Sequence, residues 1–320
     1  MLSRPTRAVG VFVNVMSFGA WFHRIGLDCR APLKGLGIGV LLGFSSLQAA
    51  PTVSYSLSGG RLGDNLLAYA RARWFSYRYQ TAFHLQAMPH LEELPAYGMF
   101  PRLEDTQGQF VEVIRVEDGG SLAKAIRAVK EQRDCLIVIT YQPEHLNEWA
   151  PGEPWWLHID VDWEDQPYLE LLRREFLPGG SEEAARSQAP SIMCHFRSLS
   201  GPDTFDASVY SFPLKHLRTS YFVKALTLCE AFLGRRLPVS VVTDDSNPQH
   251  VVKSLAQHLP RWRIAPYRPD LDARERHESA VVSDFQAMAM APVLIATQSN
   301  LSYLAARMGY QELIVYPIHG

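Results

Sequence analysis

The sequence predicts an α/β protein made of two parallel-sheet domains that face each other across a cleft. From Pro51 onward, short apolar runs typical of buried strands alternate with amphipathic runs typical of helices. Such alternation predicts parallel sheets with helices on both faces. A polar stretch with glycine and proline, residues 177–190, lies midway and is the best candidate for an interdomain connection. The 320 residues therefore suit two Rossmann-like domains, residues 51–180 and 190–320.

Each element of this alternation follows from its residue pattern. In helix 64–77, Leu67, Ala70 and Trp74 share one face, and Ser121 is a suitable N-cap for the next helix. In chain order, the first half contains strand 52–57, helix 64–77, strands 81–86 and 110–116, helix 121–132 and strand 135–140. The second half contains strand 192–197, helix 221–233, strand 239–243, helix 248–259, the apolar run 262–267, helix 283–290, strand 293–297, helix 301–308 and strand 312–316.

Residues 1–50 differ from the rest and are left outside the predicted fold. Arg30 and Lys34 precede the apolar run 36–44, and Ser-Ser-Leu-Gln-Ala-Ala50 follows it, which is the order of a secretory signal except that Leu47 is not a small residue. The run is shorter than the roughly 20 residues that span a bilayer, and it begins far from Met1. The segment is thus either a signal or membrane tether, or a disordered or packed extension.

Composition excludes some classes of function. Apolar residues make up 47% and charged residues 20% of the chain, as in ordinary globular proteins. The net charge of −2 provides no global field for nucleic acid, so no nucleic-acid partner is expected. None of the four cysteines forms a C-x-x-C pair, and all suit small buried positions. We expect no metal site and no cofactor.

A glycine-rich loop follows the first strand. The loop Ser58-Gly-Gly-Arg-Leu-Gly-Asp-Asn65 contains Gly60, Arg61 and Gly63. Because its glycines carry no side chain, a ligand can approach the backbone closely. The next helix offers free N–H groups to an anion. The loop is neither G-x-G-x-x-G nor a P-loop. The structural alternative is a strand–helix turn capped by Asp64.

A second motif closes the strand that opens the second half. His195 and Arg197 alternate along this strand, so their side chains point the same way. A guanidinium here suits a diphosphate, because it always carries its charge and binds two oxygens at once. The structural alternative is a surface arginine and a satisfied histidine.

Two later strands also end in polar residues. Asp244 and Asp245 follow a buried strand, at the sheet edge where ligands of open α/β sheets bind. They can accept from a base or ribose, or cap the helix that starts near Pro248. Ser299 and Asn300 follow another strand and suit phosphate oxygens, with helix capping by Ser299 as the alternative.

Together these four motifs resemble those of the α-1,2-fucosyltransferase and protein O-fucosyltransferase superfamily over roughly residues 52–318. Gly-Gly-Arg-Leu-Gly-Asp-Asn resembles its glycine-rich opening, and His-Phe-Arg its His-x-Arg motif. Val-Val-Thr-Asp-Asp is similar to its strand ending in Asp-Asp, and residues 283–303 to its closing helix–strand–Ser motif. Family members usually carry a second Arg and Gly-Asp after His-x-Arg, where this chain has Ser198-Leu-Ser-Gly-Pro-Asp203.

The resemblance implies a GT-B glycosyltransferase that transfers a sugar, with inversion and without a metal, from a GDP-sugar such as GDP-fucose to an acceptor hydroxyl. Carried over, Arg197 neutralises the donor β-phosphate and His195 lines the guanine or phosphate site. One or both of Asp244 and Asp245 hold the purine or ribose. The remaining expected donor-side residues are Gly60, Arg61, Gly63, Asn65, Ser299 and Asn300, and Asp64 is the only candidate base in the first loop.

Two alternative functions stay open beside the fucosyltransferase-like one. Leu304-Ala-Ala-Arg-Met-Gly309 and the Gly-Asp loop also resemble heptosyltransferases, and a catalytically inactive nucleotide-sugar-binding module is a third reading. The resemblance implies that residues 51–180 bind the acceptor and residues 190–320 the donor. The acceptor is a glycan, a lipid-linked sugar or a protein. Donor supply favours the cytoplasm or the cytoplasmic face of a membrane, with membrane association or export possible through the leader, residues 31–50 above all.

Overall fold

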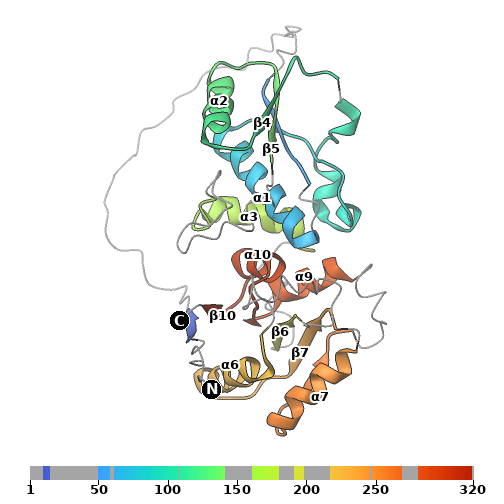
Figure 1. The fold of residues 1–320 in the computed structure, drawn as a ribbon, viewed down its shortest axis with the longest axis vertical. Helices are drawn as coiled ribbons and strands as arrows, with labels where there is room; N and C mark the ends of the chain where they lie inside the picture. Colours follow the sequence, from blue (N-terminus) through green and yellow to red (C-terminus); the bar gives the residue numbers. More distant parts are fainter. Residues whose placement is uncertain are drawn as a thin grey trace, which may run out of the picture.

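The fold combines helices with two sheets of mainly parallel strands, as the sequence predicts. The computed structural model describes residues 10–14, 50–57, 61–106, 108–140, 161–179, 191–197, 217–245, 247–268 and 280–318. Within these residues it has seven α-helices and two sheets, one of four and one of six strands. Figure 1 shows the first sheet and its helices above the second. None of the described helices is both long and apolar enough to cross a membrane.

The first sheet is parallel throughout and has the order β3-β2-β5-β4. The two crossovers that contain a helix, from β2 to β3 through α1 and from β4 to β5 through α2, step the same way along the sheet, so the right-handed rule places α1 and α2 on one face. The opposite face is covered by Leu103 and Phe110, which pack on Leu136 and Val138. The elements are β2 (Thr52–Tyr55), α1 (Leu62–Tyr79), β3 (Ala82–Phe83), β4 (Glu112–Val116), α2 (Gly119–Lys130) and β5 (Cys135–Ile139).

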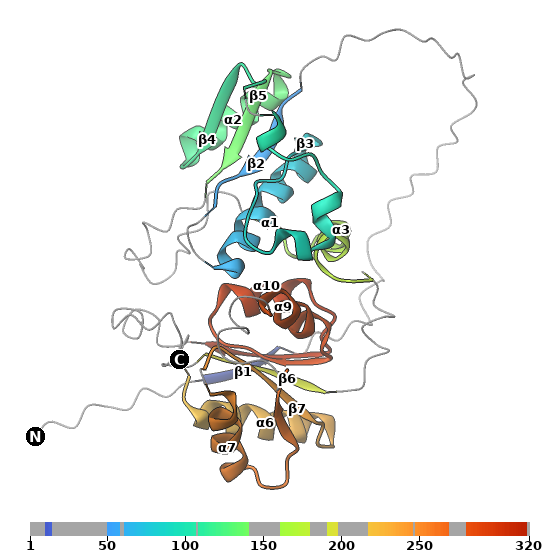
Figure 2. The ribbon, with the colours of Figure 1, turned by 90° about the vertical axis from the view of Figure 1, so that its right-hand side faces the viewer.

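The second sheet has the order β1-β10-β9-β6-β7-β8, and its strands from β10 to β8 are parallel. Chain order reverses at β6, as in doubly wound Rossmann-like sheets. Helices α6 and α7 cover one face, and α9 and α10 cover the other (Figure 2). The elements are β6 (Ile192–Phe196), α6 (Thr219–Leu233), β7 (Val239–Thr243), α7 (Pro248–His258), β8 (Ile264–Pro266), α9 (Val281–Met290), β9 (Val293–Ile295), α10 (Asn300–Met308) and β10 (Leu313–Ile318).

One strand comes from the segment that we left outside the fold. β1 (Gly10–Asn14) pairs antiparallel with β10, from Gly10 opposite Ile318 to Asn14 opposite Ile314. Excluding all of residues 1–50 was therefore wrong for these five residues. Their β-branched and aromatic run, Val11-Phe12-Val13, suits an edge strand that completes the sheet.

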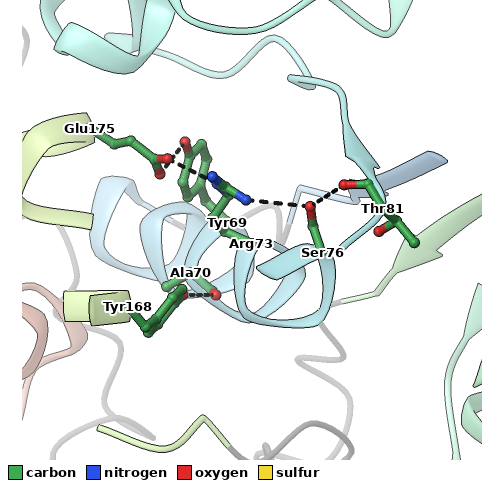
Figure 3. A network of polar contacts seen from close by, with 7 residues as sticks. All are labelled: Tyr69, Ala70, Arg73, Ser76, Thr81, Tyr168 and Glu175. Atoms are coloured by element: carbon green, nitrogen blue, oxygen red, sulfur yellow. Dashed lines mark hydrogen bonds and ion pairs between the residues drawn. The ribbon is translucent and has the colours of Figure 1, made fainter. Parts of the chain in front are cut away.

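Helix α3 (Gln166–Phe176) was also not predicted. Asp165 caps it by accepting the Tyr168 N–H at 3.0 Å, and a proline occupies its first turn. α3 packs on α1, and its Tyr168 hydroxyl donates to the Ala70 carbonyl (Figure 3). It also packs on α10, so this helix touches elements of both halves of the chain.

A single hydrophobic core joins the two halves. Its buried side chains run from Val53 and Ile137 of the first sheet, through α1 and α3, to Phe285 and Leu304 on α9 and α10. Of the expected connection, residues 177–190, all but residues 177–179 lie outside the described residues. The layer formed by α9 and α10 therefore covers one face of the second sheet and also contacts the first half of the chain.

Candidate functional site

The candidate site lies at the point in the second sheet where the chain order of the strands reverses, between β6 and β9. β6 and β9 are neighbours there, and ligands of open α/β sheets bind at the carboxyl ends of such strands. His195 and Arg197 occupy the end of β6, with 3% and 7% of their surfaces exposed. The interpretation of Arg197 as a surface arginine is therefore wrong. His195 Nδ1 lies 3.4 Å from Oγ1 of Thr297, a fully buried residue just after β9.

His195 is held in its neutral form. Burial and, to a smaller extent, the positive charge of Arg197 together lower the pKa of its imidazole to about 3. A neutral imidazole can accept a hydrogen bond at one ring nitrogen and donate one at the other. At neutral pH, Arg197 is thus the positively charged member of this pair.

An ion pair links the second motif to the third. β6 and β7 are paired in register up to Phe196 and Thr243, so the next residues along these two strands emerge at the same edge. Arg197 Nε lies 3.2 Å from Asp244 Oδ2, and both side chains are more than nine-tenths buried. We predicted a phosphate contact for Arg197 and a purine or ribose contact for Asp244. The structure shows that the two side chains contact each other.

Asp245 shapes the turn that leads into α7. Its Oδ1 accepts the Asn247 N–H at 2.7 Å, and its own N–H donates to Thr243 Oγ1 at 3.1 Å. The helix begins at the next residue, Pro248. Asn247 is the N-cap residue of α7 and makes no side-chain capping hydrogen bond. The Asp245 carboxylate therefore closes a turn before the helix and does not cap its first turn, as the capping alternative for the paired acids required.

The loop after β9 presents Ser299 and Asn300 at the start of α10. Ser299 is the N-cap residue, but its hydroxyl makes no capping hydrogen bond, so the capping alternative for Ser299 is wrong. Instead the Ser302 hydroxyl donates to the Thr297 carbonyl at 2.9 Å and braces the turn. The Asn300 amide donates to Asp64 Oδ1 at 2.5 Å.

The glycine-rich loop thus meets the closing motif. Asp64 Oδ2 accepts the Arg61 N–H at 3.3 Å, while Oδ1 accepts from Asn300. A Cβ on Gly63 would lie 2.6 Å from the Leu301 nitrogen, so Gly63 is needed for the close approach of α1 and α10. Asn65 is buried within α1. Gly60 lies outside the described residues.

The four motifs, far apart in sequence, therefore join in pairs. Arg197 contacts Asp244, Asp64 contacts Asn300, and His195 reaches Thr297 in the turn that precedes Ser299. We had not singled out Thr297, although a hydroxyl at a strand's carboxyl end is a usable signal. Among the described residues, no group of three or more His, Cys, Asp or Glu side chains could hold a metal ion.

Comparison with known proteins adds no assignment. No model of a known protein family matches this chain, and a search of curated proteins finds no match.

Proposed function

We propose that the protein is an inverting glycosyltransferase that uses a nucleotide-diphosphate sugar, with GDP-fucose as the favoured donor. One observation carries the proposal. A buried arginine lies beside a neutral histidine at the carboxyl end of β6, a central strand of the doubly wound sheet. Sheets of this kind bind nucleotides at the carboxyl ends of their strands. The donor-side cleft between two Rossmann-like domains is part of this proposal.

The proposed chemistry needs positive charge at the leaving group. The acceptor hydroxyl attacks the anomeric carbon, and the diphosphate leaves from the opposite face with an added negative charge. Arg197 and the backbone N–H groups at the start of α10 would stabilise that charge. Ser299, at the same helix start, would donate its hydroxyl to a phosphate oxygen.

The acceptor's proton requires a base, and Asp64 is a poor one in this arrangement. Both its carboxylate oxygens accept hydrogen bonds, from Arg61 N–H and from Asn300. We therefore assign Asp64 first to holding the two loops together. The same observation favours the second candidate function, an inactive module that binds a nucleotide sugar without transferring it.

A thermal-shift screen tests donor binding, because a ligand that binds the folded state stabilises it by mass action. We expect GDP to raise the melting temperature more than UDP, ADP or CMP does. A larger shift with ADP or ADP-heptose would instead support the heptosyltransferase-like alternative. Turnover of the best nucleotide sugar then separates an enzyme from a binding module.

The decisive variant is Arg197→Lys, which keeps the charge and loses the planar fork. We expect it to reduce turnover by a factor on the order of 10²–10³, which corresponds to a loss of roughly 2–4 kcal/mol of transition-state stabilisation. The control is Arg236→Lys, because Arg236 pairs with Glu230 at the surface and should tolerate the change. Equal turnover of parent and Arg197→Lys enzymes, with normal melting curves, would remove the main support for the proposed function.

A further inference from the structure

The Arg197–Asp244 ion pair raises a question about charge at the proposed diphosphate site. Arg197 supplies one positive charge, and the adjoining strand end supplies two carboxylates, Asp244 and Asp245. His195 adds no charge, because its pKa lies at about 3. The four titratable side chains of the two motifs thus carry more negative than positive charge, which is unfavourable for an incoming diphosphate.

We propose that Asp244 is the counter-ion of Arg197 in the unliganded protein and competes with the diphosphate for it. This inference rests on the proposed function, since it assumes that Arg197 binds the donor's phosphates. The 3.2 Å pair between Nε and Oδ2 is buried on both sides. In such a place a guanidinium without an anion beside it is costly, and both the carboxylate and a phosphate can supply that negative charge.

The competition has a functional consequence. A buried arginine with no counter-ion of its own would bind GDP tightly and slow its release after transfer. With Asp244 beside it, the carboxylate replaces the departing phosphate, so the diphosphate leaves a site that is again neutralised. Asp244 is then a residue that sets affinity for the diphosphate, in contrast to the purine or ribose contact expected from the sequence.

The inference predicts two effects of opposite sign for Asp244→Asn. Removing the carboxylate takes a buried anionic partner from Arg197, so the melting temperature of the unliganded protein should fall. The same change removes a negative charge a few ångströms from the phosphates. At an effective dielectric near 20, this repulsion is worth about tenfold or more in a binding constant. Inorganic pyrophosphate and GDP should therefore both bind at least about tenfold more tightly.

The experiment is calorimetric titration of the full chain with inorganic pyrophosphate and with GDP. Asp244→Ser serves as a second variant in case Asp244→Asn does not fold. Glu175→Gln is the matched control, because it also changes a buried ion pair, with Arg73, on other elements. It should leave both affinities unchanged. Arg197→Gln should lose pyrophosphate binding, with or without Asp244→Asn.

The outcomes separate the inference from the proposed function. Tighter binding of both ligands by the Asp244 variants, dependent on Arg197, supports the inference. Weaker GDP binding with unchanged pyrophosphate binding would make Asp244 a nucleoside contact and overturn it. Unchanged affinity for both ligands, while Arg197→Gln still loses them, also overturns the inference and leaves the proposed function intact. If no protein binds either ligand, or Arg197→Gln binds like the parent, the phosphate site itself is wrong.

Discussion

Gly63 shows how one missing side chain sets the spacing of two helices. From the sequence we interpreted this glycine as space for a ligand. In the structure the space is filled by the backbone of α10, because a Cβ would lie 2.6 Å from the Leu301 nitrogen and 3.0 Å from its Cα. The glycine was recognisable from the sequence. The contact of its loop with α10 could not be recognised in the same way. The paired residues Asp64 and Asn300 are 236 positions apart, and no local sequence pattern relates them.

A prediction at this scale is that Gly63→Ala destabilises the protein. The added methyl meets backbone, which cannot rotate away, so the two helices must separate. Overpacking of this kind costs about 1–3 kcal/mol of unfolding free energy. Chemical denaturation measures it. Gly119→Ala, at the start of α2, is the matched control because no atom lies within 4 Å of its added Cβ. Equal stability of the two variants would show that α1 and α10 are not in close contact.

At the scale of elements, α3 is attached to α1 by a buried polar network (Figure 3). Glu175 of α3 accepts from the Tyr69 hydroxyl at 2.8 Å and pairs with Arg73 Nε at 2.9 Å. Arg73 also reaches the Ser76 hydroxyl, which donates to the Thr81 carbonyl at 2.8 Å. The network therefore connects α3 through α1 to the segment that enters β3.

Glu175 gives a prediction with a definite pH dependence. Burial raises the pKa of its carboxyl, and the Arg73 charge and hydrogen bond oppose this only in part. An acid whose folded pKa is raised contributes stability below its unfolded pKa, and that contribution is lost as pH rises through the folded pKa. Relative to Glu175→Gln, the wild-type protein should therefore lose unfolding free energy as pH rises above about 4.5, the ordinary pKa of this carboxyl.

Glu175→Ala is the severe variant at the same position. It removes the buried carboxylate that pairs with the largely buried Arg73, so the unfolding free energy should fall by about 3–5 kcal/mol. Glu175→Gln keeps the shape and one acceptor and should cost less. Urea denaturation of the three proteins at several pH values measures both effects. A wild-type protein that gains stability over Glu175→Gln as pH rises would contradict the assigned direction of the pKa.

The elements that the sequence predicted well are those with a clear period. β7 has the predicted bounds, and the helices from α6 to α10 differ by one or two residues at their ends. α3 was missed although Asp165 and the proline after it are good start signals, because the stretch before it shows no alternation. β1 was missed because its role depends on pairing with β10, at the other end of the chain.

On the scale of the whole molecule, the two halves are held together through α10. Gly63 and Asp64 contact its start, and Arg173 of α3 binds its end. Arg173 Nε donates to the Met308 carbonyl at 2.7 Å, and Nη2 donates to the Gly309 carbonyl at 3.1 Å. Its guanidinium also lies over the Tyr310 ring, 4.5 Å from the centroid. Since α10 also covers the second sheet, the core passes from one sheet to the other without interruption.

Arg173→Ala tests whether this continuity makes the protein one cooperative unit. The change removes two charge-assisted donors from the last carbonyls of α10, so it should lower the unfolding free energy by about 2–4 kcal/mol. Because both sheets share one core, we expect one transition before and after the change. Hydrogen exchange across a urea series measures it. Peptides covering β5 and β7 should lose protection at one midpoint, and Arg173→Ala should lower that midpoint for both. Two midpoints in the parent protein, with only one shifted by the variant, would show that the two sheets unfold as separate domains.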